Sequence, residues 1–123
     1  MKSLLFYWLP FLAYAGLIYF FSSISHPSYP FTFYSVDKFY HIGEYAILGI
    51  LVIRLLKMYF PDLGYKRLKI LAILLTILYG MSDEFHQYFV PFRDASLLDL
   101  FADGIGSFLG VVVYIRLKDK GKA

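Results

Sequence analysis

The chain has 123 residues, of which 59% are hydrophobic and 21% aromatic. This length and composition suit a single small domain, 1–123, and favour a membrane over a water-soluble core. The absence of cysteine excludes disulfides, thiolate catalysis and thiolate metal sites. The net charge is only +3, and the basic residues do not alternate with aromatic ones on a polar surface, so nucleic acid is not an expected partner.

Four hydrophobic stretches predict an all-α fold, a polytopic membrane four-helix bundle. A helix needs about 20 residues to cross roughly 30 Å of hydrocarbon. The first stretch reaches that length without charge, whereas the other three must include charged residues to do so. The apolar residues that follow Ala15 argue against signal-peptide cleavage, so the first stretch is expected to remain as a span. The expected spans are 3–22, 38–59, 68–90 and 96–117.

The charge distribution predicts how the bundle is oriented. If both termini and the connection near 57–67 lie on one side, that side carries ten of the twelve Lys and Arg residues. It carries only two of the nine acidic residues. Because Lys and Arg accumulate on the cytoplasmic side of membrane proteins, both termini are expected to be cytoplasmic.

Acidic residues lie inside three of the expected spans, all toward the opposite, outer side. They are Glu44, Asp83, Glu84, Asp99 and Asp103. A carboxylate in hydrocarbon is costly, so several at one depth indicate a functional polar pocket. If all were ionised, Lys38 and Arg93 could not balance their charge. Either some carboxylates are protonated or a cation binds among them.

At the start of the second span, Asp37 (which directly precedes it), His41 and Glu44 are spaced i, i+4, i+7 and therefore share one helix face. A carboxylate–imidazole–carboxylate set is suited to acid–base chemistry or to metal binding. The alternative is that these side chains only form hydrogen bonds between helices.

The third span ends with Asp83, Glu84 and Gln87, and Arg93 follows shortly after it. The guanidinium of Arg93 can bind a carboxylate or a phosphate in a two-pronged fashion, or it can simply neutralise Asp83 or Glu84. The candidate catalytic residues are His41, Glu44, Asp83 and Glu84. The candidate ligand-binding residues are Lys38, Gln87, Arg93 and Asp99.

The fourth span places two acids and two glycines on one stripe, at Asp99, Asp103, Gly106 and Gly110. With Ala102, the glycines form a series of small residues that predicts close packing against another helix. Two carboxylates at i, i+4 can hold a divalent cation, so Asp99 and Asp103 are the candidate metal ligands. The sequence identifies no cofactor beyond this option.

At these residues the chain resembles the VanZ-like family of small bacterial membrane proteins. The matching segments are Asp37-Lys38-x-x-His41-x-x-Glu44-Tyr45-x-x-Leu48-Gly49, Ser82-Asp83-Glu84-x-His86-Gln87-x-Phe89-x-Pro91-x-Arg93 and Ser96-x-x-Asp99-x-x-Ala102-Asp103-x-x-Gly106-x-x-x-Gly110. The family often has glycine where this chain has Phe92, and many members have Asn where Asp103 stands. The resemblance implies a multi-pass protein of the bacterial cytoplasmic membrane, a role in the cell envelope, and a link to teicoplanin resistance.

The expected function is an outward-facing polar pocket that binds or processes an envelope lipid, a cell-wall precursor or a glycopeptide. The expected partners are the lipid bilayer and one of these ligands. Whether the protein is an enzyme stays open, because no nucleophile motif is present. One alternative is a non-enzymatic scaffold whose polar cluster is structural. Another is a small proton- or cation-coupled transporter. The sequence does not define the oligomeric state.

Overall fold

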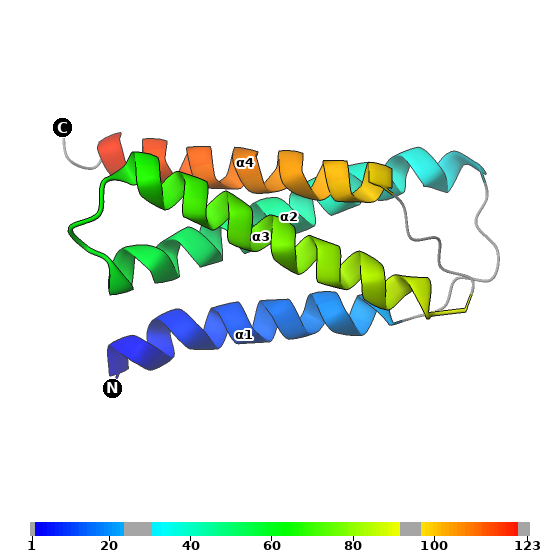
Figure 1. Cartoon of the computed structure of the whole chain (residues 1–123), viewed down its shortest axis with the longest axis horizontal. Helices are drawn as coiled ribbons and strands as arrows, with labels where there is room; N and C mark the ends of the chain where they lie inside the picture. The colour runs from blue at the N-terminus through cyan, green and yellow to red at the C-terminus, as the bar shows by residue number, and fades with distance from the viewer. Residues whose placement is uncertain (1, 24–30, 92–96, 121–123) are drawn as a thin grey trace.

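The computed structural model describes residues 2–23, 31–91 and 97–120, which form four long helices (Figure 1). They are α1 (Lys2–Ser22), α2 (Phe31–Tyr59), α3 (Tyr65–Tyr88) and α4 (Leu97–Lys120). The start of α1, the α2–α3 connection and the end of α4 all lie at one end of the bundle, as Figure 1 shows. The expected all-α four-helix architecture is confirmed.

Three helices contain stretches that are long and apolar enough to cross a membrane. These are Leu4–Ser22 in α1, Lys38–Tyr59 in α2 and Leu97–Asp119 in α4. The 24 residues of α3 would extend about 36 Å, which is long enough, but charged residues lie near both of its ends. A membrane protein is thus confirmed, and the crossing by α3 stays a prediction.

The second helix contains the expected span, found as Lys38–Tyr59, and extends before it to begin at Phe31. Residues 31–37 contain neither glycine nor proline, so nothing in their sequence opposes an additional two turns of helix. The first helix also continues without interruption through Pro10.

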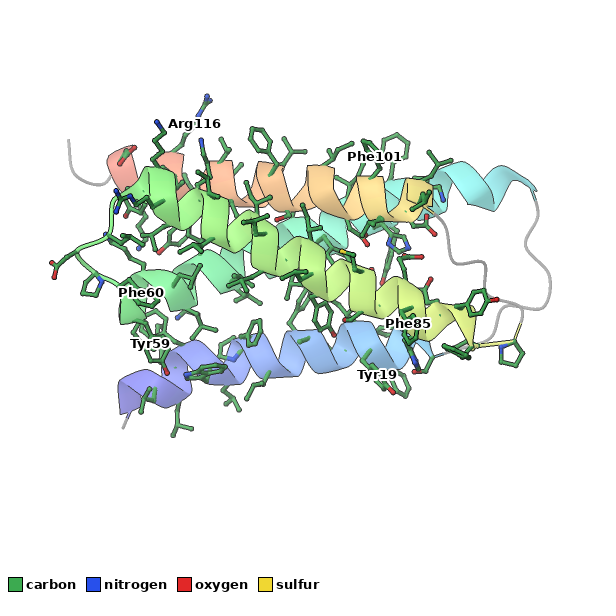
Figure 2. All side chains as sticks on the ribbon, viewed as in Figure 1. Tyr19, Tyr59, Phe60, Phe85, Phe101 and Arg116 are labelled. Atoms are coloured by element: carbon green, nitrogen blue, oxygen red, sulfur yellow. The ribbon has the colours of Figure 1, made fainter. Side chains whose placement is uncertain are left out.

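Large apolar side chains cover the outside of the bundle. Phe85 of α3 is 68% exposed and Phe101 of α4 is 73% exposed, and Phe101 lies on the outer edge of the bundle in Figure 2. Comparable exposed side chains occur on all four helices. Such a surface is untenable in water but suits a bundle surrounded by lipid.

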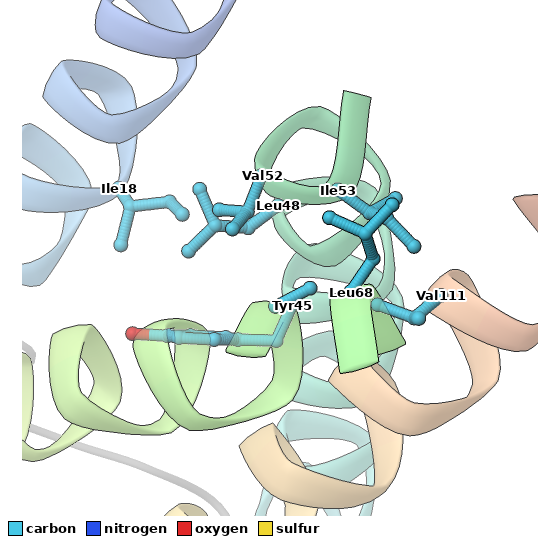
Figure 3. Packing of buried hydrophobic residues seen from close by; sticks show 8 residues of the cluster. Ile18, Tyr45, Leu48, Val52, Ile53, Leu68 and Val111 are labelled. Atoms are coloured by element: carbon cyan, nitrogen blue, oxygen red, sulfur yellow. The ribbon is translucent and has the colours of Figure 1, made fainter. Parts of the chain in front are cut away.

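The interior changes from apolar to polar along the bundle. Its hydrophobic part draws on all four helices and is shown in Figure 3: Ile18, Tyr45, Leu48, Val52, Ile53, Leu68, Ala72 and Val111. Along α3 the buried positions run from Leu68 and Ala72, near the start, to Asp83, Glu84 and Gln87, near the end. The buried side of α3 therefore contributes apolar packing at the end of the bundle where the chain termini lie. At the opposite end of the bundle, the same side of α3 contributes polar groups.

Glycines bring the backbones of α2 and α4 into direct contact. A Cβ atom added to Gly106 would lie 2.2 Å from the carbonyl oxygen of Ile42, and one added to Gly110 would lie 2.0 Å from that of Ala46. No side chain fits at either position. The packing role predicted for these glycines is confirmed, and the contact fixes the register of α4 against α2.

The first helix is attached differently, through side-chain hydrogen bonds. The hydroxyl of Tyr14 donates to the carbonyl of Glu44 on α2 at 2.9 Å, and the hydroxyl of Tyr79 on α3 donates to the carbonyl of Ala15 at 2.6 Å. Among the described residues, α1 contacts α2 and α3 but not α4.

Candidate functional site

A buried histidine–aspartate pair joins α2 to α4. His41 Nδ1 lies 2.8 Å from Asp103 Oδ1, and the two residues are 5% and 0% exposed. The pair follows from the register set one turn further on, where Gly106 packs against Ile42. Because buried polar groups are costly without a partner, the pair is a specific link between the two helices.

A second link between the same helices lies one turn closer to the polar end. The ammonium of Lys38 forms an ion pair with Asp99 Oδ1. The Asp99 side chain is 6% exposed and the Lys38 side chain 19% exposed. Lys38 is therefore the part of this pair that is closer to the surface.

The third helix adds three buried polar residues to this cluster: Asp83, Glu84 and Gln87. The hydroxyl of Tyr45 on α2 donates to Asp83 Oδ2 at 3.1 Å. The Tyr45 ring is also stacked with the ring of His41, with centroids 6.4 Å apart. Tyr45 thus connects the α3 carboxylate to the His41–Asp103 pair.

Three potential metal ligands converge within the cluster, one from each of α2, α3 and α4. His41, Glu84 and Asp99 are all buried, and each offers one ligand atom within 4.8 Å of those of the other two. We call the residues Lys38, His41, Tyr45, Asp83, Glu84, Gln87, Asp99 and Asp103 the polar cluster. It contains all but two of the site residues predicted from the sequence.

The two remaining residues are Glu44 and Arg93. Glu44 is half-buried on α2 beside α1, where its carbonyl accepts the Tyr14 hydrogen bond. Arg93 lies outside the described residues, as does the side chain of Asp37. The catalytic, ligand-binding and metal roles assigned from the sequence stay predictions for all of these residues.

Two features of this end were not predicted from the sequence. The sequence pattern did not single out Tyr45 as a site residue. Its position four residues after His41 nevertheless puts it on the same helix face. The second feature is His86, which is half-buried in the last turn of α3. Its Nε2 atom lies 2.8 Å from Ser23 Oγ, and its ring stacks on Tyr19 with centroids 4.4 Å apart.

An apolar groove opens between α1, α2 and α3. Its volume is about 280 Å³, and its lining includes Trp8, Phe11, Leu48, Tyr59, Leu75 and Tyr79. The ring centroids of Tyr79 and Tyr45 are 6.4 Å apart, so one end of the groove adjoins the polar cluster at Tyr45. A second apolar hollow, of about 450 Å³, lies between α3 and α4 and is lined by Ile77 and Phe101 among others.

The sequence comparisons identify a family. The family model described as VanZ/LLP1 matches residues 2–118, nearly the whole chain. The chain belongs to the VanZ/LLP1 family. No curated protein and no solved structure matches this VanZ/LLP1 protein. The resemblance seen in the three polar segments is confirmed by a match that also includes α1.

Proposed function

We propose that this VanZ/LLP1 protein binds an amphiphilic lipid of the bacterial cell envelope. The headgroup would contact the polar cluster, and an acyl chain would occupy the groove between α1, α2 and α3. The observation that carries the proposal is the continuity of these two regions. Tyr79 lines the groove and packs against Tyr45, whose hydroxyl bonds to Asp83 of the cluster.

The groove has a length suited to a hydrocarbon chain. Its α2 lining runs from Leu48 to Tyr59, which at 1.5 Å per residue corresponds to about 16 Å along the helix. Apolar pockets with a few polar groups at one end are typical of ligand sites. A water-soluble ligand would use the polar cluster but gain nothing from the groove.

The headgroup would carry negative charge. Lys38 is the most exposed of the charged members of the polar cluster, and its ammonium can turn from Asp99 toward a phosphate or carboxylate. Arg93, four residues after the Phe89 cap of α3, is the second cation that we assign to the ligand. Phospholipids, lipid-linked cell-wall precursors and lipoglycopeptides share this combination of a polar head and an apolar tail.

A structural role for the polar cluster is the second candidate, and the buried contacts support it. The His41–Asp103 and Tyr45–Asp83 hydrogen bonds each join two helices. In that case the residues would determine folding yield and leave ligand binding unaffected.

Processing of a bound lipid, with His41 or Glu44 as general base, extends the leading proposal by one chemical step.

Native mass spectrometry of the purified protein tests the proposal. The protein is incubated with phosphatidylglycerol, with phosphatidylcholine, with an undecaprenyl-linked cell-wall precursor or with teicoplanin, and retained ligand is counted per chain. We expect 1:1 retention of an anionic amphiphile. Lys38→Gln should weaken it about tenfold, the equivalent of one charge-assisted hydrogen bond.

Lys66→Gln is the matched control, because Lys66 is an exposed lysine near the start of α3, whereas the polar cluster lies near the end of that helix. It removes the same charge without touching the polar cluster. Equal retention by wild type, Lys38→Gln and Lys66→Gln would contradict the proposal. A folded Lys38→Gln protein in low yield, with unchanged retention, would favour the structural role. Growth of cells expressing each variant in teicoplanin then measures any contribution to resistance.

A further inference from the structure

Three side chains in the polar cluster have the composition and position of a metal-binding site. His41, Glu84 and Asp99 come from three different helices, and their ligand atoms lie within 4.8 Å of one another. All three are at least nine-tenths buried, with exposed fractions of 5%, 8% and 4%. The geometry points to a site for one divalent transition-metal ion, Zn²⁺ or Mn²⁺, that joins α2, α3 and α4.

The donor atoms select this class of metal. One imidazole nitrogen with two carboxylates is a set that Zn²⁺ accepts, usually with water completing the coordination. Mn²⁺ also combines imidazole and carboxylate ligands, whereas Mg²⁺ and Ca²⁺ prefer oxygen alone. The cysteine-free sequence offers no thiolate to favour Cu⁺.

An independent observation supports the site, namely the bond behind His41. Asp103, which is 0% exposed, lies 2.8 Å from Nδ1 and thereby orients the ring. Metal-bound histidines typically donate their second nitrogen to such a carboxylate, which fixes the tautomer and makes the ligating nitrogen more basic. Asp103 would therefore orient His41, and Nε2 would bind the ion.

The local charge also calls for a cation. Four buried carboxylates, those of Asp83, Glu84, Asp99 and Asp103, gather at this end of the bundle. Lys38 contributes one positive charge to this group through its ion pair with Asp99. Buried negative charge is expensive in a membrane interior, and a bound M²⁺ would offset two of these charges.

The distances require only a small contraction. Ligands of a tetrahedral ion with bonds of 2.0–2.1 Å lie about 3.3 Å apart, so the separations of up to 4.8 Å must shorten by about 1.5 Å at most. Rotation of the Glu84 side chain can supply much of this. A carboxylate has several lone-pair positions, so Asp99 can bind both the ion and Lys38.

Metal binding is measured on the whole protein in lipid-free detergent, after dialysis against a chelator. Zn²⁺ and Mn²⁺ are titrated separately by calorimetry, with Mg²⁺ as the comparison ion, and bound metal is counted by mass spectrometry. We expect one Zn²⁺ or Mn²⁺ per chain and much weaker Mg²⁺ binding. Because no lipid is added, the result does not depend on the proposed lipid function.

A matched pair of variants on α3 distinguishes a ligand from a nearby charge. Glu84→Gln should weaken binding about 100-fold or more, whereas Asp83→Asn removes an adjacent, equally buried charge and should cost less than about tenfold. Asp103→Asn should fall between them, as loss of a residue that orients a ligand typically costs 10- to 100-fold. Equal effects of Glu84→Gln and Asp83→Asn would overturn the assignment.

Spectroscopy of the wild type tests the site even if a variant fails to fold. Electron spin-echo spectra of the Mn²⁺-loaded protein should contain modulation from a directly bound imidazole nitrogen. The signal should persist in His86→Gln. Failure of the wild type to bind either ion at 1:1, or a spectrum without bound nitrogen, would overturn the proposal.

Discussion

The fourth helix and the first helix are attached to the same partner, α2, in opposite ways. At Gly106 and Gly110 the backbone of α4 touches the backbone of α2, with no space for even a methyl group. The α1 backbone approaches α2 and α3 through tyrosine hydroxyls, as at Tyr14 and Tyr79. The difference teaches where helix backbones lie in direct contact in this bundle and where an apolar groove remains beside them.

Backbone contact gives the α2–α4 interface a fixed register, and that register pairs His41 with Asp103 and Lys38 with Asp99. Contact through large side chains leaves α1 further away, and the apolar groove occupies the space beside it. The rigid interface is therefore suited to positioning charged groups. The looser one is suited to a flexible apolar chain.

The largest expected effect comes from breaking a buried pair in the rigid interface. Asp103→Leu removes the hydrogen bond between Asp103 and the buried His41, which should lower the free energy of unfolding by about 3 kcal/mol. Titration of the purified protein from mild detergent into dodecyl sulfate measures this quantity. Asp103→Asn keeps an acceptor oxygen and should cost less than half as much. Equal losses of unfolding free energy in the two variants would show that the missing hydrogen bond does not cause the destabilisation.

The next effect comes from separating the two backbones. Gly110→Ala would place its Cβ 2.0 Å from the Ala46 carbonyl oxygen, so α4 must move away. Overpacking of this kind costs about 2 kcal/mol. Gly16→Ala on α1 is the control, because nothing lies within 4 Å of its added Cβ, and there alanine should be neutral or slightly stabilising. A destabilisation of similar size in both variants would contradict the comparison.

A smaller effect is expected where α1 is attached. Tyr79→Phe removes the hydroxyl that donates to Ala15 and should cost about 1 kcal/mol in the same titration. Tyr40→Phe, at an exposed position on α2, should change little. A Tyr79→Phe loss as large as that of Gly110→Ala would mean that α1 is held as firmly as α4.

The smallest effect on stability is expected in the groove itself. Leu75→Trp enlarges a side chain that is already 46% exposed, so the free energy of unfolding should change by less than about 0.5 kcal/mol. The indole would nevertheless fill space that we assign to an acyl chain, and lipid retention in native mass spectrometry should fall several-fold. Unchanged retention would argue that the tail does not use this groove.

The predictability of the site differed between residues for physical reasons. The i, i+4 spacing of Asp99 and Asp103 correctly placed both on the buried stripe of α4. It could not separate their partners, since Asp103 bonds to His41 while Asp99 pairs with Lys38. Spacing along one helix defines a face, whereas the opposing residue depends on how two helices are staggered.

The sequence by itself determined the membrane class, the four helices, the glycine stripe and the one-sided placement of the acids, because these depend on composition and local periodicity. Only the tertiary structure decided that His41, Glu84 and Asp99 meet, that Tyr45 reaches Asp83, and that an apolar groove lies among α1, α2 and α3. These outcomes depend on the register and distance between helices. Both are set by packing contacts between residues that are far apart in the chain.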